Sequence, residues 1–510
     1  MATREEPTVE VKVFVDKEKS RVLFAESGKE FVDVLFSFLT LPLGTIVRLL
    51  GKEWQTGCLD ELYKSVERLH TSLFRTEACK TMLIRPINAA ARQCSQLKVR
   101  VDDTKHREVY VCGDTGCCAR ADCTYSSIPG PICKCGKALQ LAGERPEIYS
   151  GDGSDVGVFV KEDVKFIVTD DLQVSPASTS LMLSLFDKFE VQDPSSLEQR
   201  TIQLSSEKII SLLKRSLMSQ HPLTGHYFDV AIAPDASCTH MLHENLHPEQ
   251  ESDAEHTLNE FKIKVLQTRN NSSVLYAEVG GDFVDLFFGL LGIPLGSILK
   301  TYGKRASKGW VDNLYSSIDG SAKIFLRPER QTLLLSPSMA PFFGCSASKM
   351  LQVEELSPYK QEINSCFMCF KIGGFGNLAR CLEHYFKPGY GMIYKNCSNT
   401  VKKSTLSERD PKLPKGEESG NGESYVKQGT HSFMVTDDLC VLPLSLASTL
   451  QVITEAKIQR KDVVEKELTL TKTQVMDLLR AALVTRKALS TVLLPPKNMK
   501  KLHHHSFGLY

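Results

Sequence analysis

The sequence predicts an α+β protein made by tandem duplication of one domain, with mixed, largely antiparallel sheets and packed helices. Two observations support this prediction. First, residues 22–44 return as residues 274–296 with 13 of 23 positions identical and no gap, and a long internal repeat indicates a duplicated unit. Second, each copy shows strands followed by runs of helices, without the regular alternation of a parallel α/β sheet.

Each copy opens with a hairpin and a buried helix. In copy one, two short strands at residues 11–15 and 21–26 flank a polar turn. A helix is expected to begin near Lys29, and its apolar side chains point in nearly every direction, which is typical of a helix buried on most sides. Pro42 and Gly44 end this helix before a short second one.

The remaining elements of copy one also recur in copy two. Apolar residues at helical spacing predict a helix over residues 58–69, matched at residues 311–319. Residues 81–86 and 108–112 are strand-like in composition. A strand followed by a turn is expected at residues 166–176 and again at 433–443. A helix is expected to begin near Ser178 and its counterpart near Ser445, and a closing helix is expected at residues 204–217 and 470–483.

We expect two domains joined by a linker. Repeat domain 1 spans residues 9–225, and repeat domain 2 spans residues 259–490. Residues 226–258 between them include a charged run nearly free of apolar side chains, which is typical of a linker. A polar run at residues 402–424 predicts a mobile loop inside domain 2, and residues 491–510 form a tail.

Composition argues against several classes of protein. The 62 Lys and Arg residues nearly balance the 61 Asp and Glu residues, so no global positive field favours nucleic acid or an acidic membrane. Sixteen cysteines in 510 residues are too few for a disulfide scaffold, and the first residues lack the pattern of a secretory signal. We expect an intracellular protein, cytoplasmic or nuclear. The apolar segment 31–50 contains Asp33 and Pro42, so it predicts a buried helix and a turn instead of a transmembrane segment.

Several ordered motifs carry a resemblance to a known family. They are the hairpin and helix of residues 12–50, GCLDELYKSVE at residues 57–67, CKTMLIRP at residues 79–86, and the VTDDL turns that start at Val168 and Val435. With these motifs the chain resembles, over about 480 residues, a plant-specific family known as domain of unknown function six-seven-four. The resemblance implies no reaction, substrate or cofactor. It does imply a thiol cluster that ends in a C-x-C-G step, which here is Cys133 to Gly136.

Six cysteines lie within 24 residues of copy one. Structural zinc takes four thiolate or imidazole ligands, usually as two close pairs that a hairpin or loop brings together. The candidate ligands of such a site are Cys112, Cys117, Cys133 and Cys135, with Cys118 or Cys123 as alternatives. A redox cluster that forms disulfides and a group of inert thiols are the other interpretations of this pattern.

A weaker second cluster occupies the matching region of copy two. Its candidate ligands are Cys366, Cys369, Cys381 and His384, with Cys397 as a further source. Cys366 and Cys369 have the C-x2-C spacing of a zinc site, but the C-x-C-G step is absent here. We therefore expect the first cluster to be the stronger metal site.

Recurring acidic residues are the main candidates for catalysis. The pair Asp170–Asp171 follows a strand, and the pair Asp437–Asp438 follows its counterpart. Paired carboxylates can act as acid and base, but Asp residues between a strand and a segment ending in Pro more often form a turn, and we favour the turn. Asp33 and Asp285 also recur, beside buried apolar residues where capping or an internal ion pair explains them as well as catalysis does.

These features favour a non-catalytic intracellular protein, a protein-interaction scaffold with a structural zinc ion in the first repeat. The main alternative is an enzyme or small-ligand binder with a site between the two repeats. A weaker alternative is zinc-dependent nucleic-acid binding, which requires a basic face around residues 112–135. The first two hypotheses differ in whether Asp171 and Asp438 point into a shared cleft or hydrogen-bond their own backbone. We expect an unknown protein partner and no membrane association.

Overall fold

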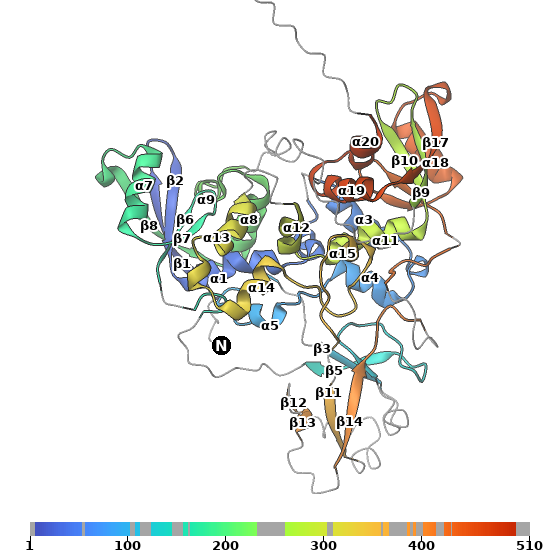
Figure 1. The fold of residues 1–510 in the computed structure, drawn as a ribbon, viewed down its shortest axis with the longest axis horizontal. Helices are drawn as coiled ribbons and strands as arrows, with labels where there is room; N and C mark the ends of the chain where they lie inside the picture. The colour runs from blue at the N-terminus through green and yellow to red at the C-terminus, as the bar shows by residue number, and fades with distance from the viewer. Residues whose placement is uncertain are drawn as a thin grey trace, which may run out of the picture.

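The computed structural model shows two bodies, each built around a five-stranded sheet, with a third sheet beneath the second body (Figure 1). The structure describes residues 6–53, 57–102, 108–112, 124–144, 157–161, 164–231, 261–302, 310–358, 361–366, 385–387, 391–393, 401–414, 423–429 and 431–495.

The two large sheets have equivalent strand orders. The first sheet has the order β7 (Val174–Pro176), β6 (Phe166–Thr169), β2 (Arg21–Ser27), β1 (Val9–Asp16) and β8 (Leu197–Leu204). The second has the order β16 (Val441–Pro443), β15 (Phe433–Thr436), β10 (Val274–Val279), β9 (Phe261–Thr268) and β17 (Val463–Leu470). Neighbouring strands in both sheets are antiparallel. The predicted α+β class is therefore confirmed, and the matching orders are consistent with a repeated domain.

Among the described residues, the helices of the first half are α1 (Lys29–Ser37), α2 (Leu43–Leu49), α3 (Leu59–Arg68), α4 (Glu77–Ile84), α5 (Ala91–Cys94), α7 (Thr179–Phe189), α8 (Ser206–Met218) and α9 (Pro222–Tyr227). Those of the second half are α11 (Gly281–Gly289), α12 (Leu295–Tyr302), α13 (Trp310–Asp319), α14 (Pro328–Leu335), α15 (Ser346–Met350), α18 (Leu446–Glu455), α19 (Lys472–Val484) and α20 (Ala488–Leu493). Short 3-10 turns, among them η1 (Phe38–Thr40) and η4 (Leu290–Gly292), connect some of them.

The apolar stretch at residues 31–50 is a broken pair of buried helices. Helix α1 continues into η1, and Pro42 then takes an extended conformation before α2 begins at Leu43. Proline at this position cannot donate a backbone hydrogen bond to the preceding helix, so the chain turns there. Within the described ranges, none of the helices combines the length and the apolar character that a membrane crossing requires.

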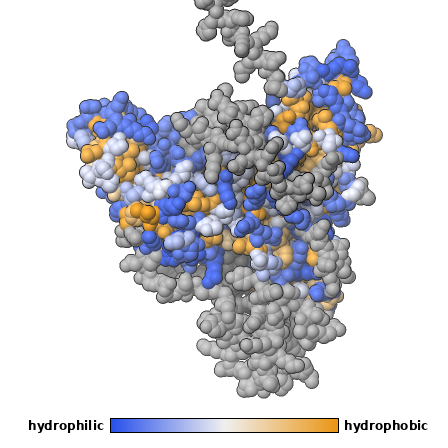
Figure 2. Space-filling model, viewed as in Figure 1, coloured by the Kyte–Doolittle hydropathy of each residue, from blue (hydrophilic) through white to orange (hydrophobic). Residues whose placement is uncertain are grey.

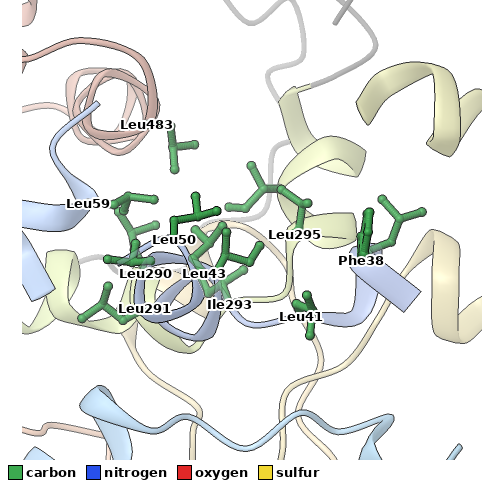
Figure 3. Packing of buried hydrophobic residues seen from close by; sticks show 14 of the residues in the cluster. Phe38, Leu41, Leu43, Leu50, Leu59, Leu290, Leu291, Ile293, Leu295 and Leu483 are labelled. Atoms are coloured by element: carbon green, nitrogen blue, oxygen red, sulfur yellow. The ribbon is translucent and has the colours of Figure 1, made fainter. Parts of the chain in front are cut away.

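The two halves cross each other at the turns that contain Pro42 and Pro294. Leu43 N donates to Ile293 O at 2.9 Å, and Leu295 N donates to Leu41 O at 2.9 Å. Buried leucine and isoleucine side chains from both halves surround this crossing (Figure 3). Beyond the crossing, some helices of each half pack in the body built on the other half's sheet, and the chain then returns to its own sheet.

Helices α3 and α13 are exchanged between the bodies as a result. Helix α3 of the first half lies beside α19 of the second body (Figure 1), where Ser65 Oγ accepts from Val441 N at 2.8 Å. Helix α13 lies beside α8 of the first body, where Ser317 Oγ accepts from Val174 N at 2.9 Å. Each body therefore contains residues from both halves of the sequence, while the domain boundaries at 9–225 and 259–490 stay predictions.

A buried aspartate in each body holds the segment that returns to the sheet. The Asp33 carboxylate on α1 accepts hydrogen bonds from the backbone N atoms of Val158, Phe159 and Val160 at 2.6, 2.8 and 2.9 Å. Burial raises the pKa of Asp33 to about 6, although these hydrogen bonds lower it. Neither capping nor an ion pair, the roles expected from the sequence, describes this contact.

Asp285 on α11 has the equivalent role in the second body. It accepts from the backbone N atoms of Tyr425 and Val426, both at 2.9 Å, and from Gln428 Nε2. Burial raises the pKa of Asp285 to about 7. Both carboxylates are therefore structural clamps for backbone segments that carry no regular secondary structure.

The third sheet combines strands from the two halves. Its order is β11 (Gln361–Cys366), β14 (Val401–Glu408), β4 (Thr124–Ser126), β3 (Glu108–Cys112) and β5 (Leu139–Glu144). The halves join where β14 pairs with β4 in parallel, with Glu408 opposite Tyr125. A separate two-stranded sheet pairs β12 (Tyr385–Lys387) with β13 (Gly391–Ile393).

Two segments differ from their predicted structure. Residues 81–86, expected as a strand, lie largely in helix α4, because Thr76 accepts from Cys79 N as its N-cap and the buried residues recur at helical spacing. Within the polar run 402–424, expected as a loop, residues up to Glu408 belong to strand β14. That strand has few apolar residues, so its sequence gives little sign of β structure.

Candidate metal centre

The C-x-C-G step forms a tight hairpin turn. Ile132 and Ala138 pair across it, Cys133 N donates to Lys137 O at 2.8 Å, and Gly136 N donates to Cys133 O at 2.8 Å. Gly136 has a φ of 89°, a conformation that residues with a Cβ rarely adopt. The glycine therefore permits the turn that places Cys133 and Cys135 close together.

The third cysteine reaches the turn through the sheet. Cys112 is the last residue of β3, and it stands opposite Leu139, the first residue of β5. The Sγ atoms of Cys112 and Cys135 are 3.4 Å apart, and the three Sγ atoms of Cys112, Cys133 and Cys135 all lie within 4.8 Å of one another. Cys112 and Cys133 are buried, whereas Cys135 is exposed.

This spacing fits a metal ion. A tetrahedral zinc site with Zn–S bonds of about 2.3 Å places its sulfur atoms roughly 3.8 Å apart, close to the separation of this triad. A disulfide would need the two Sγ atoms at about 2.05 Å. Thiolate donors suit soft or borderline ions such as Zn²⁺ and Cu⁺. The triad can therefore hold a metal ion. Beside it, Thr124 Oγ1 donates a hydrogen bond to Cys133 Sγ at 3.9 Å.

The other predicted ligands of this site fall outside the described residues. They are Cys117, Cys118 and Cys123. The structure thus brings together three of the four residues in the first predicted ligand set and leaves the fourth ligand a prediction. The second cluster also stays a prediction, because only the backbone of Cys366 is described, at the end of β11. Its other members, Cys369, Cys381, His384 and Cys397, lie outside the described ranges.

The recurring Asp171 and Asp438 bond within their own turns. Asp171 accepts from the hydroxyl of Thr169, and Asp438 Oδ1 accepts from Thr436 Oγ1 at 2.5 Å. The turns continue through Leu172 and Leu439, both with positive φ, before the next strand. The expected turns are therefore present, with each of these carboxylates bonded to a threonine hydroxyl where we expected a backbone N–H.

Asp170 and Asp437 bond to the helices that close each half. Asp170 accepts from Thr224 N at 2.8 Å and Thr224 Oγ1 at 2.7 Å, within α9. Asp437 accepts from Ser490 N at 2.7 Å and Ser490 Oγ at 2.6 Å, within α20. Carboxylates near the N-terminus of a helix satisfy N–H groups that lack partners inside the helix, so both aspartates stabilise the fold.

Lys412 is a buried lysine that no pattern in the sequence indicates. This residue belongs to the polar run expected as a loop, but its side chain is fully buried. Lys412 Nζ donates to Gly344 O at 2.7 Å and lies 3.9 Å from the centroid of the Tyr425 ring. Burial lowers the pKa of Lys412. An isolated lysine in a polar run is more often exposed, so only the tertiary structure could reveal it.

The fold and the cysteine cluster define an α+β protein that carries a candidate metal centre on a sheet of its own. The chain belongs to the family described as "Protein of unknown function (DUF674)", whose sequence pattern matches residues 5–473. The resemblance recognised from the motifs is therefore confirmed. No curated protein and no solved structure matches the chain. The family description states no reaction, substrate or cofactor.

Proposed function

We propose that the chain binds one structural zinc ion through Cys112, Cys133 and Cys135, with Cys117 as the fourth ligand and Cys118 or Cys123 as alternatives. The observation that carries this proposal is the convergence of three sulfur atoms within 4.8 Å. Four thiolates would complete the closed tetrahedral set that is typical of structural zinc. A thiolate-rich set with no open position favours a structural role over catalysis.

The zinc ion would stabilise a part of the third sheet in which the described residues form only a small core. The buried cluster beside the cysteines contains Val109, Tyr125 and Leu139, with two cysteines as its other buried members. So few buried side chains provide little stability, and small units often depend on a metal for this reason. When bound, the ion would supply cross-links between β3 and the hairpin that precedes β5.

The same sheet joins the two halves of the chain. Arg409 N donates to Tyr125 O at 2.7 Å, and Glu408 Oε1 accepts from Ser127 N at 3.1 Å. Stabilising β3, β4 and β5 would therefore also fix the strand β14 from the second half. We infer that the zinc site maintains the connection between the halves through this sheet.

We further propose that the protein is an intracellular, cytoplasmic or nuclear, protein-interaction scaffold. Free thiols at Cys58, Cys79 and Cys345 support a reducing compartment. On helix α18, the side chains of Leu446 and Leu450 are 85% and 65% exposed, and hydrophobic residues are visible among hydrophilic ones in that region (Figure 2). Exposed leucines on one helix favour a protein partner over a solvated surface.

Metal analysis and thermal unfolding test the zinc proposal. The purified full chain is expected to contain about one equivalent of zinc, and Cys135→Ser is expected to lose it and to have a lower melting temperature. Cys440→Ser, at a half-buried thiol on the β15–β16 turn, serves as the matched control and should retain the metal. Zinc bound by the tail histidines His503–His505 would remain in both variants. A metal-free wild-type chain with an unchanged melting temperature in the Cys135→Ser variant would refute the proposal.

The scaffold proposal requires a separate experiment. A pull-down with the wild-type chain is compared with pull-downs using Leu450→Glu and Glu455→Ala, both on helix α18. A specific protein partner lost only with Leu450→Glu would support the scaffold and assign its surface. Recovery of the same proteins with all three baits would contradict a docking role for this helix.

A further inference from the structure

Among the described cysteines, Cys135 is the one that is exposed and also has a second sulfur atom close to its own. Its Sγ lies 3.4 Å from that of the buried Cys112. By contrast, several other thiols lie in or against the cores of the two bodies, and desolvation raises their pKa. These thiols are Cys58, Cys79, Cys94 and Cys345. Reaction with a dissolved oxidant requires an accessible thiolate, so Cys135 is the described cysteine best placed to react.

We propose that the cluster is a peroxide-sensitive switch, in which Cys135 is oxidised by a hydroperoxide and then forms a disulfide with Cys112, expelling the metal ion. The metal-release part rests on the proposed zinc site. The disulfide itself rests only on the position of the two sulfur atoms. Cys133, which is buried, remains reduced after the reaction.

The proposed chemistry balances in two steps. The Cys135 thiolate attacks one oxygen of hydrogen peroxide, the O–O bond breaks, and a sulfenic acid and hydroxide form. The Cys112 thiolate then attacks the sulfenic sulfur, the S–S bond forms, and a second hydroxide leaves. The two thiolates lose two electrons to the peroxide, and the two hydroxides take up protons to give two water molecules.

The geometry requires only a small movement. The Sγ atoms must approach from 3.4 Å to the roughly 2.05 Å of a disulfide, a shift of about 1.4 Å. Cys135 lies at the exposed end of the hairpin turn that begins at Ile132, so its side chain can move without rearranging a packed core. Loss of two of three described thiolates would leave too few ligands for a closed zinc site.

Release of the metal would act on the sheet shared by the two halves. In the oxidised protein, the disulfide replaces the metal between β3 and the hairpin, but it no longer includes Cys133. The packing of Cys133 beside Tyr125 and Leu139 would then lose its covalent support.

Peptide mapping of the full chain tests this switch. Trypsin cleaves after Arg107, Arg120, Lys134 and Lys137, so Cys135 is isolated in the tripeptide 135–137, while Cys112 lies in peptide 108–120. After treatment with a few equivalents of hydrogen peroxide and alkylation of the remaining thiols, we expect peptide 135–137 joined to peptide 108–120, with fragment ions placing the bond at Cys112. A chromogenic chelator should detect zinc release in parallel, and Cys112→Ser should abolish the cross-link.

Each outcome of this experiment has a distinct meaning. A bond from peptide 135–137 to peptide 121–134, a bond to Cys117 or Cys118, or over-oxidation of Cys135 without any cross-link would overturn the proposed pair. A Cys112–Cys135 bond formed without zinc release from zinc-loaded protein would overturn the switch. If the purified chain contains no metal but still forms this bond, the proposed zinc function fails while the thiol pair stands.

Discussion

Removing the Asp33 carboxylate should loosen the first body at one identifiable place. Asp33→Ala leaves the backbone N atoms of Val158, Phe159 and Val160 without the acceptor that each now has within 2.9 Å. A buried donor without a partner costs about 1–3 kcal/mol. We therefore expect the free energy of unfolding of this body to fall by at least about 3 kcal/mol, and more if water cannot enter the vacated space.

The assay combines a global and a local measurement. Urea unfolding followed by circular dichroism gives the midpoint for each variant, and hydrogen exchange with mass spectrometry follows the amides of residues 157–161. A loss of about 3 kcal/mol corresponds to exchange that is faster by roughly 100-fold, since 1.36 kcal/mol is tenfold. Glu30→Ala is the matched control, because Glu30 lies on the same helix but is exposed, so neither reading should change appreciably.

Two results would refute this reasoning. Unfolding of Asp33→Ala within about 1 kcal/mol of the wild type, with normal protection of residues 157–161, would mean that other contacts hold this segment. These include the pairing of Val160 with Leu326 and the bond from Arg327 N to Phe159 O. Equal faster exchange in Asp33→Ala and Glu30→Ala would mean that α1 itself had loosened.

Two further predictions concern pH and the exchanged helices. Because the pKa of Asp285 is raised from 3.8 to about 7, the folded state holds a proton that the unfolded state has released, so the stability from this group falls as pH rises from about 4 to 7. The difference in unfolding free energy between the wild type and Asp285→Asn should shift against the wild type by up to about 4 kcal/mol over that pH range. If this difference stays constant with pH, Asp285 is ionised in the folded state throughout the range. Ser317→Ala should lower the melting temperature, because Val174 N loses its acceptor, with a cost of about 1–3 kcal/mol; Ser316→Ala, one residue away on α13, should have little effect. Equal melting temperatures for the two variants would argue against placing α13 in the first body.

Much of the local structure could be predicted from the sequence. The opening hairpin, the buried helix α1 and the stop at Pro42 follow from alternation, apolar content and proline chemistry, which act over a few residues. The predicted strand at residues 81–86 is wrong, because this short apolar run fits either element, and Thr76 as the N-cap favours the helix α4. Strand β14 is not predictable from local signals, because it owes its conformation to pairing with β11 and β4.

The candidate metal centre could be predicted only in part, because its described ligands come from both neighbouring and distant positions in the chain. Cys133 and Cys135 are close in sequence, and Gly136 marks the turn that joins them. Cys112 is 21 residues before Cys133 in the chain, so only the pairing of β3 with β5 brings it to the same point. The thiol density indicated a cluster, but the choice of ligands within it depends on that sheet.

The sequence alone indicated a repeated segment, the α+β class and the position of the thiol cluster, because periodicity, turn residues and residue density are properties of short segments. The tertiary structure decided which half completes which body. Ser65 and Ser317 have the same local neighbours whether or not their helices exchange, and only the crossing at Pro42 and Pro294 sends each to the opposite sheet. Long-range packing also gave Asp33 and Asp285 their backbone partners, since those partners lie more than 100 residues away in the chain.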